Sequence, residues 1–349
     1  MNLTSFIETV ARAPSASSLS PQPGALDAVE AEMLQLCGDD EVVGRIAREQ
    51  LKNGGKRIRA RLALAAAAAL GVEDEDARSW AVAVEILHNA TLVHDDVQDG
   101  DVYRRGRRTA WAAHGVPQAI NVGDLMLMLP ALAIDGIEVG GAVRQCLTRA
   151  LFSAAVETVR GQGADLALRT TLDSADVDVV AAYMRCIEAK TGALFALPVT
   201  GAALLAGQPP ENARALSSPF AHLGVLFQLQ DDVLDLFGDK GRDARGSDIR
   251  EGKISALVVE HLRLHPAERS WLLRILDAPR DATADADVDA VIARFDDGGA
   301  KDAVVARIAS LCTLAVHEAA PPLHSIVVDL IARVLAPIQH CFGDHHAFS

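Results

Sequence analysis

Two clusters of aspartates have the residue types and the spacing that bind divalent cations. They lie 136 residues apart and consist of Asp95, Asp96 and Asp99 and of Asp231, Asp232 and Asp235. On a helix, residues three and four apart share a face, so like charges in each cluster repel by about 0.2–0.5 kcal/mol per pair. Mg²⁺ reverses this repulsion, because it usually binds through one or two carboxylates plus substrate phosphates. Since the pattern occurs twice after apolar helical segments, it favours a Mg²⁺ site for phosphate chemistry over two solvated helix ends.

A site that combines carboxylates, Mg²⁺ and phosphate also needs cationic side chains. Candidates lie soon after each cluster and in two further segments: Lys56, Arg59, Arg104, Arg105, Lys190, Arg245 and Lys253. Lysine is scarce in this chain, with six in all, yet three of them belong to this set. The planar fork of arginine matches phosphate oxygens at two points, whereas lysine acts as a point charge. Each residue alone is typical of a surface charge, but together they indicate direct contacts to phosphate.

Composition and charge exclude several classes of function. The 349 residues include 47 acidic and 33 basic side chains, and the net charge of −14 has the wrong sign for a nucleic-acid binder or a basic membrane-surface protein. The segment Gly54-Gly55-Lys56-Arg57 lacks the loop length and the hydroxyl of a nucleotide-binding P-loop. The five cysteines show no C-x-x-C pairing, which argues against disulfides and zinc and predicts a reducing, cytoplasmic compartment.

The elements that must position these residues are helices. Residues 1–25 have a composition rich in Ser, Pro and Ala that predicts a flexible lead-in, whereas residues 26–349 repeat apolar residues every three or four positions. Glycine and proline breaks in this pattern predict a single all-α domain, a bundle of about ten to twelve helices. The uncharged run 191–210 is long enough to span a bilayer, but its prolines and glycines favour a buried core helix. We therefore expect no stable membrane insertion.

The motifs together resemble those of the trans-type isoprenyl diphosphate synthases, or polyprenyl synthetases. They occur in the order typical of that family: GGKRIR (54–59), HDDVQD (94–99), RRG (104–106), KTG (190–192), FQLQDDVLDLFGD (227–239) and GSDIREGK (246–253). The resemblance implies the isoprenoid synthase fold, an all-α single-domain bundle around a deep central cavity, with the two clusters facing each other across its mouth. It also implies a homodimer.

The resemblance implies a role for each matching residue. The six aspartates would bind about three Mg²⁺ ions that hold the allylic diphosphate, Asp232 less directly than the others. The isopentenyl diphosphate site matches Lys56, Arg59, His88 and Arg105. The contacts to the allylic diphosphate match Arg104, Lys190, Arg245 and Lys253. Polar groups beside the reacting carbon match Thr191 and Gln228, which complete the expected catalytic set with Lys190 and Arg104.

The implied reaction condenses isopentenyl diphosphate head to tail with dimethylallyl, geranyl or farnesyl diphosphate. Mg²⁺ and the cationic side chains stabilise the charge on the departing diphosphate. The resulting carbocation is kept in a dry, apolar pocket until the new bond forms and a proton is lost. The sequence offers no dedicated general base, so the departing diphosphate is the expected proton acceptor.

Residues before the first cluster are expected to set the length of the product. In the family, bulky aromatic residues at the positions of Thr91 and Ala90 stop growth at fifteen carbons, but both residues are small here. A deeper floor is expected from one or more of Leu87, Met126, Met128 and Leu129. We therefore expect a C20 geranylgeranyl product, with chains of C25 or more as the alternative.

Two other functions remain open. A class I terpene cyclase would share the first cluster, but it normally has an Asn/Ser/Glu triad in place of residues 231–235 and needs no isopentenyl site. A regulatory subunit of a heteromeric synthase typically loses aspartates from one cluster, whereas this chain has all six.

The chain departs from the family pattern at a few positions. Arg108 replaces a usual proline and Trp111 a frequent histidine, but neither is a predicted Mg²⁺ ligand. The histidine-containing tail (340–349) is expected to be a frayed polar end rather than a metal site.

Overall fold

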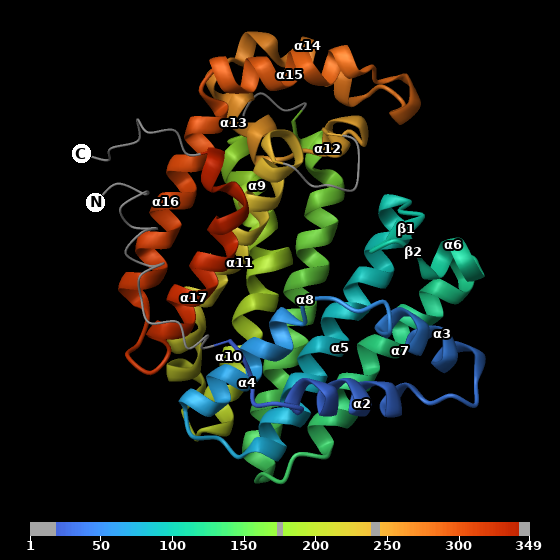
Figure 1. Cartoon of the computed structure of the whole chain (residues 1–349), viewed down its shortest axis with the longest axis vertical. Helices are drawn as coiled ribbons and strands as arrows, with labels where there is room; N and C mark the ends of the chain where they lie inside the picture. Colours follow the sequence, from blue (N-terminus) through green and yellow to red (C-terminus); the bar gives the residue numbers. More distant parts are fainter. Residues whose placement is uncertain (1–18, 173–176, 239–244, 342–349) are drawn as a thin grey trace.

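The computed structural model describes residues 19–172, 177–238 and 245–341, which form a long bundle of helices (Figure 1). Within these residues the only strands are the dipeptides β1 (Tyr103–Arg104) and β2 (Arg107–Arg108), which pair as a small antiparallel hairpin. The predicted all-α class is therefore confirmed. Residues 1–18 of the predicted lead-in and the tail from residue 342 onward lie outside the described residues.

The described helices divide into two groups along the chain. The first group contains α2 (Ala25–Cys37), α3 (Val42–Leu51), α4 (Ile58–Ala69), α5 (Asp74–Asp99), α6 (Ala110–His114), α7 (Val116–Asp135) and α8 (Gly141–Thr171). The second contains α9 (Val179–Ile187), a π-helical segment (Glu188–Gly192), α10 (Ala193–Leu205), α11 (Pro210–Phe237), α12 (Ser247–Arg250), α13 (Ala256–Leu264), α14 (Arg269–Leu276), α15 (Asp285–Asp297), α16 (Ala300–Glu318) and α17 (His324–Leu335). Short 3₁₀ segments lie at Pro266–Glu268, Arg280–Ala282 and Ala336–Cys341. These are more elements than the sequence breaks indicate, because the connections after α11 fold into short helices.

Three long helices carry most of the candidate residues. α5 has 26 residues, α8 has 31 and α11 has 28, so each is roughly 39–46 Å long at 1.5 Å per residue. α5 begins with the acidic residues 74–76, whose carboxylates favour a helix N-terminus, and it ends at Gly100, whose φ of 72° suits a helix C-terminus. The first aspartate cluster thus occupies the last turns of α5, and the second lies near the C-terminal end of α11.

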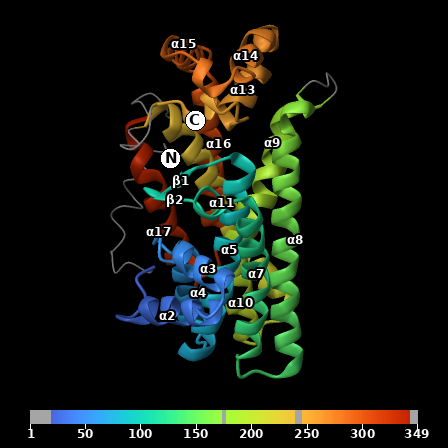
Figure 2. The same ribbon diagram turned by 90° about the vertical axis from the view of Figure 1, so that its right-hand side faces the viewer.

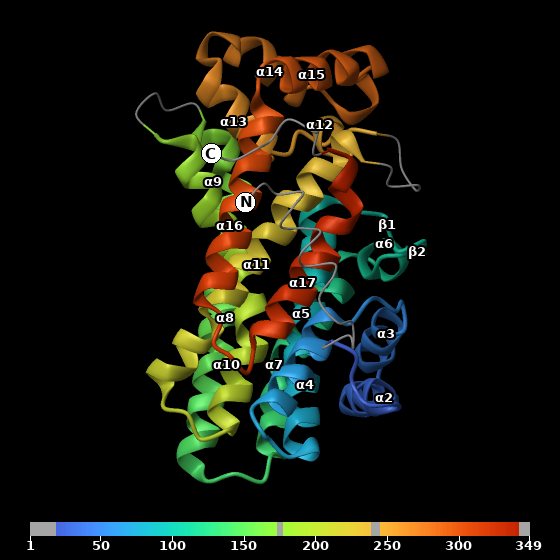
Figure 3. The same cartoon turned by 60° about the vertical axis from the view of Figure 1, so that its left-hand side comes forward.

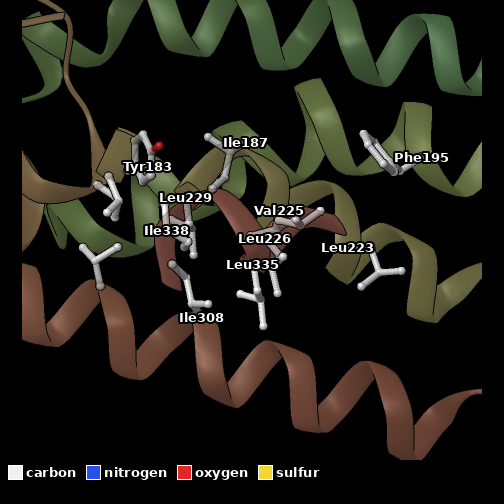
Figure 4. Packing of buried hydrophobic residues seen from close by; sticks show 14 of the residues in the cluster. Tyr183, Ile187, Phe195, Leu223, Val225, Leu226, Leu229, Ile308, Leu335 and Ile338 are labelled. Carbon is white, nitrogen blue, oxygen red and sulfur yellow. The ribbon is translucent and has the colours of Figure 1, made fainter. Parts of the chain in front are cut away.

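Two packed apolar regions hold the long helices in place. Between α11, α16 and α17, side chains such as Leu226, Leu229, Ile308 and Leu335 interdigitate and are almost completely buried (Figure 4). Figure 3 shows α16 and α17 lying against this side of α11. The second region joins α5, α7, α8 and α10 and includes the fully buried Trp80. Because burial of apolar surface is the main favourable term in folding, these regions fix the helices whose ends carry the charged residues.

Two glycines allow helices to approach more closely than side chains would permit. A Cβ atom at Gly161 of α8 would lie 2.5 Å from the backbone nitrogen of Lys190. A Cβ atom at Gly201 of α10 would lie 1.9 Å from the indole of Trp80, whose Nε1 donates to the carbonyl oxygen of Pro198 at 3.0 Å. α8 therefore lies directly against the π-helical segment, and this contact places Lys190 beside α8.

The uncharged run 191–210 contributes a buried core helix, as predicted. α10 is its helical part, and most of the side chains of α10 are buried. A different helix, α7, is the one among the described residues whose length and apolar composition would suffice to cross a membrane. Within its apolar window 44% of the residues are buried, and core helices meet the same criterion, so this is a weak indication of a membrane span.

Candidate active site

A cavity of about 380 Å³ brings the two aspartate clusters together. Its charged lining residues come from five parts of the chain and are Asp99, Asp165, Arg169, Lys190, Asp231, Asp232, Asp248, Glu251 and Lys253. The C-terminal ends of α8 and α11 lie toward the same end of the bundle, and α5 points its last turn in that direction (Figure 1). Carboxylates from two helices that are far apart in the sequence therefore face one cavity.

Two lysines join the walls of this cavity. Lys253 Nζ lies 2.9 Å from Glu251 Oε2 and 3.8 Å from Asp99 Oδ2, so it links the segment after α11 to α5. Lys190 Nζ lies 2.9 Å from Asp165 Oδ2, which links the π-helical segment to α8. Burial lowers the pKa of Lys253, but the hydrogen bond to Glu251 and the negative charges of Glu251, Asp248 and Asp99 together outweigh burial, and the pKa is raised overall. Lys253 therefore remains charged.

Asp232 is a buried anchor for three elements. Its Oδ2 accepts hydrogen bonds from the Tyr183 hydroxyl and from the Ala256 backbone nitrogen (2.7 Å), and its Oδ1 accepts one from Gln228 Nε2 (3.1 Å). Burial raises the pKa of Asp232 to about 6, against the effect of these donors. A buried carboxylate requires such partners, so Asp232 ties α11 to α9 and to the start of α13.

Asp235 and Asp96 also accept hydrogen bonds from protein donors. Asp235 accepts from Ser247 Oγ (2.5 Å) and from the backbone nitrogen of Asp248 (3.0 Å), and it thereby holds the first turn of α12. Asp96 accepts from Arg104 Nε at 2.5 Å, and burial raises the pKa of Asp96 to about 6. The cluster residues that are exposed or half-buried are Asp95, Asp99 and Asp231.

The acidic residues do not enclose a metal ion by themselves. Within the part of the chain that the structure describes, no three Asp, Glu, His or Cys side chains lie close enough together to hold one. Such a donor set fits Mg²⁺, which keeps several waters and binds through one or two carboxylates plus substrate phosphates. Asp99 and Asp231 are the accessible carboxylates from the two clusters that face the cavity.

A second cavity, of about 1030 Å³, shares Asp231 with the first. Its walls between α4, α10, α11 and α17 combine the basic side chains of Lys56, Arg61 and Arg333 with apolar ones such as Phe195. The sequence predicts Lys56 as a binding residue but not Arg61 or Arg333, because neither lies in a recognised motif. A cavity with basic groups and apolar walls suits an amphiphilic ligand with an anionic head.

Arg59, His88 and Arg105 form a basic cluster beside Gly54 and Gly55. The guanidinium of Arg105 donates to the carbonyl oxygen of Gly54, and a Cβ atom at Gly55 would lie 2.4 Å from it. The paired glycines therefore let this arginine lie against the backbone. Burial lowers the pKa of Arg59 to about 10. Burial and then the positive charge of Arg59 lower the pKa of His88 well below its usual range, so the imidazole is neutral.

Nine of the predicted metal-binding and substrate-binding residues lie outside the lining of both cavities. Six of them belong to the aspartate clusters or to the basic cluster beside Gly54 and Gly55, and the other three are Thr191, Arg104 and Arg245. Thr191 is buried within the π-helical segment. Arg104 in β1 is held by Asp96. Arg245 Nε donates to the carbonyl oxygen of Leu236 at 2.6 Å and so caps the C-terminal end of α11. Contacts of these residues to a ligand remain predictions.

The residues expected to set product length occupy different environments. Leu87 and Ala90 have 1% and 0% of their surfaces exposed and belong to the apolar region between α5, α7, α8 and α10, together with Met126 and Leu129. Thr91 is half-buried, and its hydroxyl donates to the carbonyl oxygen of residue 88. Met128 is 68% exposed on α7, so the prediction that it helps to form the floor that limits product length is wrong. Helical geometry is the reason, because α7 turns residues 126 and 129 inward and residue 128 outward.

Asp165, Tyr183 and Arg169 line the first cavity, but sequence reasoning missed them because they lie outside the recognised motifs. A signal for Asp165 exists in the sequence. It follows Gln162 by three residues, so two polar side chains share one face of α8. Gln162 Nε2 donates to Gln98 Oε1 on α5 at 2.7 Å, so this face of α8 contacts the helix of the first cluster.

Known proteins resemble this chain in sequence and in fold. Residues 40–295 match the model of a family described as "Polyprenyl synthetase". A short chain isoprenyl diphosphate synthase of Methanocaldococcus jannaschii is 34% identical over 72% of this chain and 76% of its own length. The crystal structure of a geranylgeranyl pyrophosphate synthetase from Pyrococcus horikoshii superimposes with a TM-score of 0.79 at 27% identity, covering 95% of this chain and 99% of that one. A polyprenyl synthase of Caulobacter crescentus, complexed with calcium and isoprenyl diphosphate, superimposes with a TM-score of 0.76 at 26% identity, covering 95% and 97% of the two chains.

The neutral state of His88 predicts a dependence of stability on pH. Its pKa in the folded protein lies below the ordinary histidine value of 6.5, so the unfolded state binds more protons as the pH falls through that value. The free energy of unfolding therefore decreases with falling pH, by at most about 1.4 kcal/mol per pH unit from this residue. His88→Gln removes the titration, so urea unfolding of the variant should lose less stability than wild type between about pH 7.5 and pH 5.5. A parallel loss in both proteins would show that His88 is not held neutral.

Proposed function

The chain belongs to the polyprenyl synthetase family, and from this membership we propose that it condenses isopentenyl diphosphate with an allylic diphosphate to extend a trans-polyprenyl chain. The allylic substrate is dimethylallyl, geranyl or farnesyl diphosphate. The observation that carries the proposal is the cavity in which aspartates from α5 and α11 meet Lys190 and Lys253. Relatives that are named as isoprenyl diphosphate synthases support the same class of reaction.

Mg²⁺ is the proposed cofactor, with about three ions per site, because the accessible carboxylates fit an ion that is shared with phosphate. The residues proposed to hold it are Asp95, Asp99 and Asp231. Bound Mg²⁺ stabilises the negative charge that develops on a departing diphosphate. Asp96, Asp232 and Asp235 belong to the same motifs, and their hydrogen bonds support a role in fixing the helix ends that carry the accessible carboxylates.

Basic side chains bind the two substrates in neighbouring places. The residues proposed for the allylic diphosphate are Arg104, Lys190, Arg245 and Lys253. Those proposed for isopentenyl diphosphate are Lys56, Arg59, His88 and Arg105. The second cavity supports separate, neighbouring sites for the two substrates. Lys56 lies in its wall, and Asp231 lines both cavities, so the two cavities adjoin. As a neutral imidazole, His88 offers one hydrogen-bond donor and one acceptor without adding to the positive charge of the arginines around it.

Thr191 and Gln228 orient the reacting carbon in this proposal. The amide nitrogen of Gln228 donates to Asp232, so its amide oxygen is the end that can meet a developing positive charge. The buried hydroxyl of Thr191 offers a second oxygen beside Lys190. The carbon–oxygen bond to diphosphate breaks first, and the isopentenyl double bond then attacks C1 of the resulting allylic carbocation. The proton lost from the new chain passes to the departing diphosphate.

The depth of the apolar region beneath the first cluster supports a C20 geranylgeranyl product. Ala90 is small, so it places no bulky side chain directly below the aspartates. Leu87 lies eight residues before Asp95, about 12 Å along the helix. Trp80 lies on the same face fifteen residues before Asp95, about 22 Å away. Its indole is fixed by Pro198, so it is the first rigid aromatic barrier on this face. Chains of C25 or more remain the alternative.

The exposed faces of α7 and α8 support a homodimer. On α8 the large apolar side chains recur at helical spacing and are 46–62% exposed: Phe152, Val156 and Val159. On α7 they are Ile120, Met128 and Leu132. The two helices lie side by side on one flank of the bundle (Figure 2). Exposed apolar surface of this kind marks an interaction site, and a two-fold contact with a second copy would cover both faces at once. Such a contact also accounts for the apolar character of α7 in a soluble cytoplasmic enzyme.

Product analysis tests the proposed reaction. Purified protein incubated with Mg²⁺, isopentenyl diphosphate and each of the three allylic diphosphates should yield longer prenyl diphosphates. Asp99→Ala and Asp231→Ala should each lower the rate at least about 100-fold while helical content is unchanged, because each removes an accessible carboxylate from one wall. A hydrocarbon product from the allylic substrate alone would indicate a cyclase. No product from any allylic substrate would refute the proposed reaction.

Chain length should respond to residues on the buried face of α5. Ala90→Phe places a bulky side chain directly below the aspartates, where the growing chain is proposed to lie, so the main product should become shorter. Leu87→Ala removes side-chain volume one turn deeper and should make the product longer. Chromatography of the dephosphorylated prenyl alcohols measures both changes. An unchanged distribution in both variants would contradict this account of the floor.

Dimerisation should depend on the exposed face of α8. Val159→Glu places a charge within this apolar face, so light scattering should report one chain of 36.9 kDa instead of two. Leu314→Glu on α16 is the matched control, since Leu314 is 40% exposed and α16 packs against α11, α13, α15 and α17. It should leave the mass unchanged. The proposed interface is wrong if Val159→Glu has the mass of a dimer.

A further inference from the structure

Arg169 lines the cavity that contains both aspartate clusters, yet it belongs to none of the motifs that identify the site. It lies four residues after Asp165 in the last turns of α8, at the end of the bundle where α14 also lies (Figure 2). Residues at this spacing share a helix face. Because Asp165 pairs with Lys190 on that face, Arg169 is directed toward the same group of charges.

The guanidinium of Arg169 is held by Asp277 at two points. Its Nε lies 2.8 Å from Oδ1 of Asp277, and its Nη2 lies 2.7 Å from Oδ2. Asp277 directly follows α14, and the two side chains are 31% and 52% exposed. Ion pairs exposed to this degree contribute little to stability. The pair is therefore a weak link between α8 and α14, and a stronger anionic partner can displace it.

A diphosphate has the chemistry to displace this carboxylate. The planar fork of arginine binds two phosphate oxygens in the same way as two carboxylate oxygens, and charge-assisted hydrogen bonds of this kind are the strong ones. The fork of Arg169 already has the two-point arrangement with Asp277. The other cations in the lining, Lys190 and Lys253, are point charges that carboxylates of the same cavity hold.

We propose that Arg169 is a further diphosphate-binding residue, and that Asp277 competes with the diphosphate for its guanidinium. This inference rests on the proposed function, because it takes the diphosphate group as the ligand of the cavity. In the resting protein Asp277 holds the fork at the edge of the cavity. A bound diphosphate takes the fork from Asp277 and thereby separates α8 from α14, so the link between these helices reports whether the cavity is filled.

Competition makes a prediction that a purely structural ion pair does not. Loss of Arg169 removes a contact to the ligand, so binding should weaken. Loss of the Asp277 charge removes the competitor, so binding should strengthen. In a structural ion pair both changes break the same link and act in the same direction. The double variant distinguishes competition from a structural ion pair. Under competition, the substitution at Asp277 has no effect on binding once Arg169 is absent.

Calorimetric titration with inorganic pyrophosphate in the presence of Mg²⁺ measures these effects on the full chain. Arg169→Gln should weaken binding about tenfold, whereas Asp277→Asn should strengthen it. Arg169→Gln/Asp277→Asn should match Arg169→Gln, and Arg169→Lys should fall between it and wild type. Arg160→Gln is the matched control on α8, since Arg160 is 72% exposed and pairs with Glu157 away from the cavity. It should bind as wild type does.

Three results would overturn the inference. Arg169→Gln could bind pyrophosphate as tightly as wild type. Asp277→Asn could weaken binding in the same direction as Arg169→Gln. The double variant could combine two separate losses. In each of these cases wild type still binds pyrophosphate, and the proposed function stands. If wild type binds none with Mg²⁺ present, the proposed function and this inference fail together.

Discussion

Crowding of carboxylates at one end of the bundle is the constraint on which the rest of the structure depends. Asp99 from α5 and Asp231 from α11 line one cavity with several other acids. Two like charges about 4 Å apart repel by about 4 kcal/mol at an effective dielectric constant near 20. Lys190 and Lys253 offset this repulsion, and their ion pairs join the π-helical segment to α8 and the segment after α11 to α5. Two of the six lysines therefore lie among the carboxylates of this cavity.

The accessible carboxylates depend on buried neighbours for their positions. Asp96 and Asp232 belong to the same clusters but accept hydrogen bonds from β1, α9, α11 and α13. Apolar packing along α5 and α11 then fixes the rest of each helix. In each cluster, therefore, at least one carboxylate anchors the helix end through hydrogen bonds, and another carboxylate remains accessible at the cavity. This division explains why three acids that look equivalent in the sequence differ in exposure.

Sequence reasoning predicts the local features well and the contacts between distant segments poorly. Helical periodicity and glycine breaks give the all-α class, and the buried nature of 191–210 follows from its composition. The π-helical segment has no comparable signal, because it arises where Gly161 and Lys190 approach each other. Asp165 and Arg169 lie outside the recognised motifs for the same reason, since only the packing of α8 brings them to the cavity. Met128 is adjacent in sequence to the buried Leu129, but the turn of α7 directs it to the opposite, exposed face, so the prediction that it forms part of the floor is wrong.

We propose that the two clusters bind the same metal–diphosphate group from opposite walls. Crystals grown with inorganic pyrophosphate and Mn²⁺, which replaces Mg²⁺ and scatters anomalously, can locate this group. We expect anomalous peaks within about 2.0–2.3 Å of carboxylate oxygens of both Asp99 and Asp231, with the pyrophosphate between them. Manganese bound at one cluster alone, or away from both, would contradict it.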